Sequence, residues 1–345
     1  MTDTLTKKSN HLLDDKAALL SVRDLRIEID GGEGSFEVVT GATLRARRGE
    51  VVGVVGESGS GKSLTLRAIA GLLPPGITIG GGEVDVDGID VVSADRSALR
   101  RLHGGIVGMI FQEPMTALNP TMRIGSQIAE AARAHSKVSR SESKARAIKL
   151  LGQMGFTEPE RRYRLYPHEL SGGMRQRVVI AIALAGDPSL LLCDEPTTAL
   201  DATVTMKVLD LIVGLAKELD IGIVLVTHDL GVAAKVCDRI VVMYAGRMVE
   251  EGPSEELLRR PRHPYTLALL QAVPTRESTI EDLKAIPGTP PTIGEIPEGC
   301  PFMPRCAFAQ PECSEPVHLV EVAEGRTSAC RRHELLAQLQ GEQDA

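Results

Sequence analysis

The sequence has little of what nucleic-acid-binding proteins need. It contains no tryptophan, four tyrosines and five phenylalanines in 345 residues, so few rings are available to stack on bases. Its 46 Asp and Glu residues outnumber 39 Lys and Arg residues, which gives a net charge of -7. An acidic chain with few aromatic side chains is a poor match for a polyphosphate partner, and we expect no nucleic acid.

Long apolar runs are also missing. No stretch approaches the roughly 18 apolar residues that cross a bilayer, and the polar start, Met1 to Lys16, lacks the apolar stretch of about 7 to 15 residues found in signal peptides. We find no lipidation signal, no strongly basic amphipathic helix and no internal repeat. The sequence therefore predicts a protein that stays in the cytosol and reaches a membrane only through a partner.

The composition, 43% hydrophobic and 25% charged, is that of a globular chain long enough for one large domain and a smaller one. Alternating segments at Leu20 to Ile29 and Val38 to Arg45 predict a β-rich layer. Fully apolar runs at Val51 to Val55, Leu190 to Cys193 and Ile223 to Val226 indicate parallel strands covered on both faces. The predicted fold is α/β.

We divide the chain into three parts on these patterns, the second of which contains an insertion. A polar tail covers residues 1–17, and an α/β nucleotide-binding domain covers 18–255. Within that domain, helical periodicity and Pro-bearing loops predict an inserted helical subdomain at about 124–185. A segment enriched in proline and cysteine follows, and it predicts a separate C-terminal module over residues 256–345.

The most informative motif lies between the apolar run Val51 to Val55 and a helix-forming run from Leu64 to Leu72. Its glycines let backbone N–H groups turn toward an anion, Lys62 reaches terminal phosphates, and the Ser63 hydroxyl ligates Mg2+. The motif therefore predicts a nucleoside triphosphate site. Its predicted ATP-binding residues are Gly56, Ser58, Gly59, Ser60, Gly61, Lys62, Ser63 and Leu64.

Two carboxylates, Asp194 and Glu195, directly follow the apolar run Leu190 to Cys193. The carboxyl edge of a parallel sheet is where such folds hold ligands. Asp194 is placed to hold Mg2+, and Glu195 is placed to orient and polarise the attacking water. The alternative is that the two carboxylates are simply exposed to solvent at the end of the strand. The phosphate loop in the same chain argues against this alternative.

A second anion-binding helix start is predicted at Leu170 to Arg177, which reads LSGGMRQR. This segment closely resembles the signature of ATP-binding cassette (ABC) ATPases, with Met174 in place of the more common glutamine, and the resemblance spans residues 18–255. Other family motifs follow in order. They are the Mg2+- and water-sensing glutamine at Gln112, the D-loop at Thr198 to Asp201, and the switch histidine, which contacts the γ-phosphate, at His228.

The resemblance implies that two cassettes sandwich two ATP molecules, so one chain cannot complete a site. Catalysis is then positioning and electrostatics around the γ-phosphate, with Glu195, His228 and Gln112 as the catalytic group. Magnesium is expected on Ser63, Gln112 and Asp194. The residues implied to face the partner's ATP are Ser171, Gly172, Gly173 and Gln176, with Asp201 in the D-loop.

An aromatic residue that stacks on adenine is expected upstream of the phosphate loop. The region holds Ile29 and, after a short insertion, Phe36. We take Phe36 as the stacking residue, although a phenylalanine beside a strand is often a core residue.

Two further segments, Met109 to Pro120 and Pro261 to Thr266, look like those of the dipeptide/oligopeptide permease branch. The resemblance implies a subunit on the cytoplasmic face of the inner membrane. Its partners would be a second ATPase, expected as a homologous heterodimer partner, two membrane permease subunits and an external solute-binding protein. The cargo would be peptides or a related solute such as a nickel complex. Residues 115–122 would receive the membrane subunit's coupling helix. A soluble ATP-gated scaffold is the alternative from another class, and a separate cassette without membrane spans argues against an exporter.

Six cysteines occur in the chain, and two of them, Cys193 and Cys237, sit in apolar segments typical of buried thiols. A reducing cytosol disfavours disulfides for the other four, and four thiolates suit a soft metal. Their spacing is looser than that of structural zinc, so an iron-sulfur cluster, zinc and free thiols all stay open. The resemblance to the permease C-terminal extension implies a [4Fe-4S] cluster. Its ligands would be Cys300, Cys306, Cys313 and Cys330.

Overall fold

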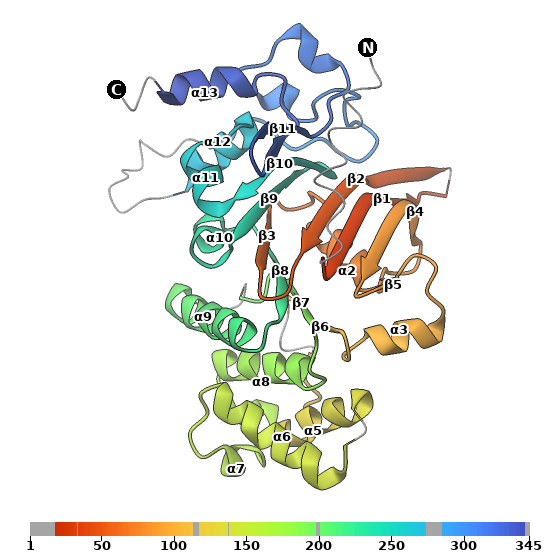
Figure 1. Ribbon diagram of the computed structural model, residues 1–345, viewed down its shortest axis with the longest axis vertical. Helices are drawn as coiled ribbons and strands as arrows, with labels where there is room; N and C mark the ends of the chain where they lie inside the picture. The colour runs from red at the N-terminus through yellow and green to blue at the C-terminus, as the bar shows by residue number, and fades with distance from the viewer. Residues whose placement is uncertain are drawn as a thin grey trace.

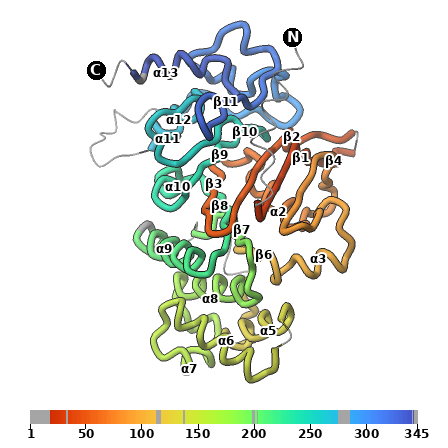
Figure 2. The backbone as a smooth tube through the Cα atoms, viewed as in Figure 1, coloured from red at the N-terminus to blue at the C-terminus, as the bar shows by residue number. Residues whose placement is uncertain are grey.

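A computed structural model describes residues 18–32, 34–112, 117–136, 138–197, 201–273 and 285–341. Figure 1 shows three regions along the longest axis of the molecule. A group of helices lies at one end, the β-rich body lies in the middle, and the C-terminal segment covers the other end. The backbone trace in Figure 2 shows the chain running from the β-rich body into the helical end, returning to the body, and then forming the C-terminal segment.

The central sheet holds the three apolar runs predicted as parallel strands. Its order is β11-β12-β10-β9-β3-β8-β7-β6, and the neighbours from β9 to β6 are parallel. The five parallel strands are β3 (Val51–Val55), β6 (Val107–Ile110), β7 (Leu190–Asp194), β8 (Gly222–Thr227) and β9 (Arg239–Tyr244). The predicted α/β fold is therefore confirmed.

Alternate residues of the central strands enter two different cores. Val51 and Val55 of β3 pack with the helices of one face, whereas Val52 and Val54 pack with the antiparallel strands and helix of the other. Successive strand side chains point to opposite faces, so a strand covered on both sides must be apolar throughout. This explains why these segments are uninterrupted apolar runs. The helices around the sheet are α2 (Lys62–Ile69), α3 (Arg96–Leu102), α9 (Ala202–Glu218) and α10 (Leu230–Val236).

A separate antiparallel sheet has the order β2-β1-β4-β5. Two of its strands match the alternating segments, and a third was not predicted because it carries Gly80, Gly81 and Gly82, which are rare inside strands. This strand pairs with β1 along most of its length, and these backbone hydrogen bonds hold the glycine-containing segment in an extended conformation. The strands are β1 (Leu20–Asp30), β2 (Ser35–Ala46), β4 (Ile77–Val86) and β5 (Ile89–Asp90).

The helical end corresponds to the inserted subdomain predicted at about 124–185. Ser139 and Glu142 form a reciprocal capping box at the start of one helix, which explains its sharp beginning in a charged segment. Among the described residues, no helix is long and apolar enough to span a bilayer. The helices are α5 (Ile124–His135), α6 (Arg140–Gln153), α7 (Pro159–Arg162) and α8 (Gly172–Leu184), with a 3-10 turn at Pro167–Glu169.

The C-terminal segment is built onto the central sheet. β12 pairs with β10, and the side chains of Tyr265 and Phe302 lie in the same core as the central strands. The segment predicted as a module of its own therefore shares sheet and core with the preceding domain. The elements from β10 onward are β10 (Arg247–Pro253), which ends the preceding domain, α11 (Ser254–Arg259), α12 (Pro264–Ala272), β11 (Val320–Ala323), β12 (Arg326–Ser328) and α13 (His333–Gly341), with 3-10 turns at Met303–Arg305 and Pro311–Ser314.

One buried carboxylate ties this segment to β10. Glu250 is fully buried and accepts hydrogen bonds from the backbone N–H groups of Arg262 (2.7 Å) and His263 (2.9 Å). Arg326, itself nearly buried, donates to the same carboxylate at 3.2 Å. Burial raises the pKa of Glu250, and these donors oppose that shift. Three chain segments therefore converge on one side chain.

We expect Glu250→Ala to lower the free energy of unfolding by about 3–5 kcal/mol, because the substitution leaves the Arg326 guanidinium buried without its partner. Denaturant unfolding of the full chain measures this loss. Glu256→Ala is the matched control, since Glu256 also approaches Arg326 but is half exposed, and its effect should stay within about 0.5 kcal/mol. Equal effects of the two substitutions would contradict the buried network.

Candidate active site

The phosphate loop connects β3 to α2 and is shaped by glycines that cannot be replaced. A Cβ atom at Gly56 would lie 2.0 Å from the carbonyl oxygen of Met243, so only glycine allows the loop to pass β9. Gly61 has φ of +99°, a conformation that L side chains rarely adopt, and it lies against Val39. The loop is therefore held between the end of β9 and β2.

Lys62 begins α2 and turns back over the loop. Its ammonium donates to the carbonyl oxygens of Gly56 and Glu57, both at 2.8 Å, and to Ser60 Oγ at 3.3 Å. Burial lowers the pKa of Lys62, while Glu195, Asp194 and Glu57 favour the charged form. A positive charge is thus concentrated beside the loop, as phosphate binding requires. Leu64, in the first turn of α2, packs its side chain against the core.

The proposed magnesium ligands of two separate segments are in contact. Ser63 Oγ donates to Asp194 Oδ1 at 2.6 Å, and the Asp194 carboxylate is almost fully buried at the end of β7. A hydroxyl and a carboxylate are oxygen donors of the kind that Mg2+ prefers. The residues present therefore fit the ion that the phosphate loop implies.

Glu195 is the centre of a second cluster at the same sheet edge. Its Oε2 atom lies 3.2 Å from His228 Nδ1, at the end of β8, and accepts from Gln112 Nε2 at 3.3 Å, just after β6. The Glu195 backbone has φ of +46°, which is unusual for a residue with a side chain. The three residues predicted to be catalytic are thus brought together by three adjacent strands.

The signature segment lies at the start of α8, in the helical end. Ser171 is the N-cap, its Oγ accepting from the Met174 N–H at 3.4 Å, and Ser171 and Gly172 are exposed. Ser171 therefore caps the helix start, and its role in binding an anion stays a prediction. The interpretation of Gln176 is corrected, because its side chain is fully buried inside the subunit and cannot face a partner's ATP in this conformation.

Other predicted residues are placed less completely. Asp201 caps α9 by accepting from the Val204 N–H at 2.9 Å, and the rest of the D-loop, residues 198–200, lies outside the described residues, as do 115 and 116 of the predicted coupling surface. Phe36 is exposed and pairs with Ile29 across β1 and β2. Both candidates for adenine stacking therefore lie at one position of the sheet, and the assignment to Phe36 stays a prediction.

The four clustered cysteines line one cavity in the C-terminal segment. His263 and Phe302 also line this cavity. Cys313 and Cys330 are buried, and burial raises the pKa of the Cys330 thiol to about 12. Within the described ranges, no three His, Cys, Asp or Glu side chains are close enough to bind a single metal ion. Cys193 and Cys237 are buried and far from the cavity lining, as predicted for structural thiols.

Three residues at the phosphate loop were not found by the sequence reasoning. Glu57 of the loop is bound on one side by Arg305 and on another by Tyr265, both from the C-terminal segment. Tyr265 is completely buried, so its hydroxyl reaches the loop from inside the core. Nothing in the spacing links a loop residue to one 248 positions later, so no sequence signal pointed to Arg305.

The fold and this sheet edge define an ATP-hydrolysing cassette. The chain matches the family model described as ABC transporter over residues 39–198 and the one described as oligopeptide/dipeptide transporter, C-terminal region, over 249–313. A solved dimer of the cassette MJ0796 bound to ADP and Pi covers 68% of this chain and 98% of its own, with a TM-score of 0.61 and 30% identity.

Relatives of the whole chain agree. The oligopeptide transport ATP-binding protein OppD of Bacillus subtilis is 48% identical over 84% of this chain and 82% of its own. OppD of Escherichia coli is 43% identical over 91% of this chain and 93% of its own. The chain belongs to the ABC transporter family, in its oligopeptide/dipeptide transporter branch, and it is an ATPase.

Replacing the central carboxylate separates binding from hydrolysis. We expect Glu195→Gln to lower ATP turnover at least about 100-fold, because an amide cannot accept the proton of the attacking water. Nucleotide binding should persist, since the shape of the side chain is kept. Phosphate release and ATP retention by the full chain measure the two effects. Glu83→Gln, an exposed residue of β4, is the control, and unchanged phosphate release by Glu195→Gln would refute the assignment.

Proposed function

We propose that this chain is the ATP-hydrolysing subunit of an importer for dipeptides and oligopeptides or a related small solute such as a nickel complex. The observation that carries the proposal is a complete hydrolytic cluster, Glu195, His228 and Gln112, in a chain that continues into the oligopeptide-type C-terminal region. The OppD relatives are named for oligopeptide transport. Cargo would not need to touch this chain, because binding and passage belong to partner subunits.

The ATP site is proposed to be shared between two cassettes. Ser171 and Gly172 are exposed at the start of α8, so their helix end is accessible to a second subunit. The MJ0796 cassette was solved as a dimer with ADP and Pi. The signature of one subunit would close the phosphate loop of the other, with a homologous subunit as partner.

Within each site, the residues of this chain hold and orient. The phosphate loop and Lys62 bind the β- and γ-phosphates through backbone N–H groups and one ammonium. Ser63 and Asp194, with Gln112, would hold Mg2+, and the bound ion would supply positive charge beside the phosphate oxygens. Glu195 orients the water and accepts its proton, and His228 fixes the Glu195 carboxylate through the 3.2 Å contact.

The proposed complex contains a second ATPase, two membrane permease subunits and an external solute-binding protein, which would place this chain on the cytoplasmic face of the membrane. Residues 117–122 follow Gln112 in the chain and precede α5, the first helix of the helical end, and we propose that the coupling helix contacts this segment.

Purification of the tagged full chain from its own cells tests this proposal. We expect two integral membrane proteins and a second ATP-binding subunit to copurify. Membrane vesicles that contain this complex should take up radiolabelled dialanine only when ATP is supplied. Glu195→Gln should leave the complex assembled while it abolishes uptake. Recovery with soluble metabolic enzymes would instead support the scaffold, and ATP-dependent uptake of nickel but not of peptide would correct the cargo.

A [4Fe-4S] cluster in the cysteine cavity is also proposed. Four cysteines from three separated stretches face one cavity, which fits the ligation of such clusters by four thiolates. Without a metal, burial would keep the Cys300, Cys306 and Cys330 thiols protonated, because it raises the pKa of each. A bound cluster supplies one-electron chemistry and a rigid link between the stretches. Zinc and free thiols are the alternative states.

Anaerobic purification tests the cluster directly. We expect about four iron and four sulfide per chain and a broad visible absorption that bleaches on reduction. Cys306→Ser should lose the iron, whereas Cys237→Ala, outside the cavity, should keep it. Colourless, iron-free protein would remove the cluster, and one zinc per chain would replace it with a mononuclear site.

A further inference from the structure

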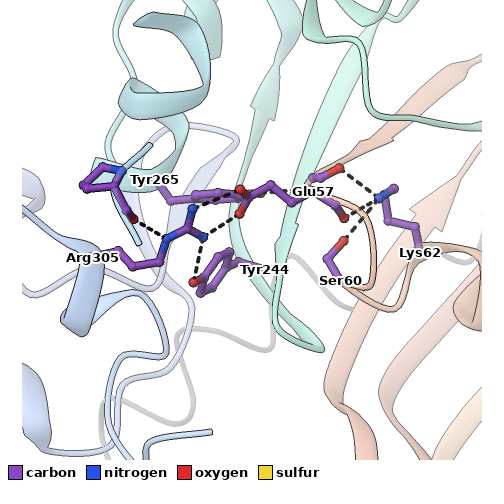
Figure 3. Close-up of polar contacts among 8 residues, drawn as sticks. Glu57, Ser60, Lys62, Tyr244, Tyr265 and Arg305 are labelled. Atoms are coloured by element: carbon purple, nitrogen blue, oxygen red, sulfur yellow. Dashed lines mark hydrogen bonds and ion pairs between the residues drawn. The ribbon is translucent and has the colours of Figure 1, made fainter. Parts of the chain in front are cut away.

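The first half of the phosphate loop is held from outside the nucleotide-binding domain. Arg305 donates from Nη1 to Glu57 Oε2 at 2.7 Å and from Nη2 to Glu57 Oε1 at 3.0 Å, a bidentate pair. Figure 3 shows Arg305 reaching Glu57 from the C-terminal segment, with Lys62 on the opposite side of the loop. The pair joins two residues that are 248 positions apart in the chain.

Arg305 is itself fixed on every side. Its guanidinium also donates to the Tyr244 hydroxyl at 3.1 Å and to the Pro287 carbonyl at 2.8 Å, and it lies over the Tyr244 and Phe302 rings. Only 5% of its side chain is exposed. A buried and fully bonded guanidinium has one rotamer, so it can define the position of the Glu57 carboxylate.

The same loop residue is fixed at its backbone. The Glu57 N–H donates to the Tyr265 hydroxyl at 2.8 Å, and the Glu57 carbonyl accepts from Lys62 at 2.8 Å. Glu57 is therefore bound by its side chain, its N–H and its carbonyl. The last of these bonds connects it to the lysine that meets the phosphates.

We infer that Arg305 and Tyr265 are positioning residues for ATP, which hold the Glu57 peptide so that the loop is formed before nucleotide binds. Both residues bind Glu57 and act on the loop through it. A loop that is formed in only a fraction of molecules binds with an affinity reduced by that fraction. The inference rests on the ATP site alone and not on transport, so failure of the importer proposal would leave it intact.

Nucleotide affinity of the full chain tests the inference. In the Glu195→Gln background, Arg305→Met should raise the Kd for Mg-ATP about tenfold, if the loop is then formed about one tenth of the time. Arg305→Lys keeps the charge but not the bidentate geometry and should raise it less, about threefold. Arg161→Met, which removes an exposed ion pair with Glu158, should leave the Kd unchanged.

Two readouts separate positioning from general damage. Glu57→Ala should raise the Kd about as much as Arg305→Met, and the double variant should be no worse than either, because both remove one interaction. With Glu195 restored, kcat at saturating ATP should stay within about twofold of wild type. This is expected because the substitution disturbs the phosphate loop only while no nucleotide is bound. Effects that multiply in the double variant would overturn the inference.

A milder variant covers the case in which Arg305→Met fails to fold. Tyr265→Phe keeps the buried ring and removes only the hydroxyl that accepts from Glu57, so it should raise the Kd about threefold to tenfold. Tyr163→Phe, in the helical end, is the matched control. A folded Tyr265→Phe protein with unchanged Kd for Mg-ATP would overturn the role of the C-terminal segment.

Discussion

The parallel alignment of five central strands is the constraint on which the site depends. In the order β9-β3-β8-β7-β6 every strand ends at the same edge, and four of the five ends lead to residues of the site. The phosphate loop with Lys62 follows β3, and His228 follows β8. Asp194 ends β7, Glu195 comes directly after it, and Gln112 follows β6. Strands in a sheet covered on both faces must be apolar, so the polar residues can lie only beyond the strand ends. Because the strands are parallel, those ends meet at one edge and bring the polar residues together.

The C-terminal segment changes how this edge should be understood. β9 ends at Tyr244, beside the phosphate loop, and Tyr244, Tyr265 and Phe302 form an aromatic cluster with centroid separations of 4.5 to 5.3 Å. Arg305 crosses that cluster to reach Glu57, and the next residue, Cys306, lines the cysteine cavity. His263 lies beside both the aromatic cluster and the cysteine cavity: its ring is 6.2 Å from that of Phe302, and its Nε2 atom is 4.0 Å from Cys300 Sγ. One layer of side chains therefore separates the cysteine cavity from the phosphate loop.

The predictions from sequence succeeded where the residues that determine a local structure lie close together in the chain. The phosphate loop carries its glycines, lysine and serine within eight positions, and the strands before it and before Asp194 are recognisable from apolar runs of ordinary length. They failed where the reason lies elsewhere in the chain. The glycine-bearing strand β4 is a strand because β1 pairs with it, and Gln176 is buried because α8 turns that face inward.

The sequence by itself determined the class of ligand and the order of the hydrolytic residues, since local backbone geometry and strand burial follow from neighbouring residues. Tertiary structure alone decided that Glu195, His228 and Gln112 meet at one carboxylate and that four cysteines with irregular spacing face one cavity. It also decided that the far end of the chain holds Glu57. Such contacts depend on how separate elements pack, and packing is set by the whole core rather than by any pattern along the chain.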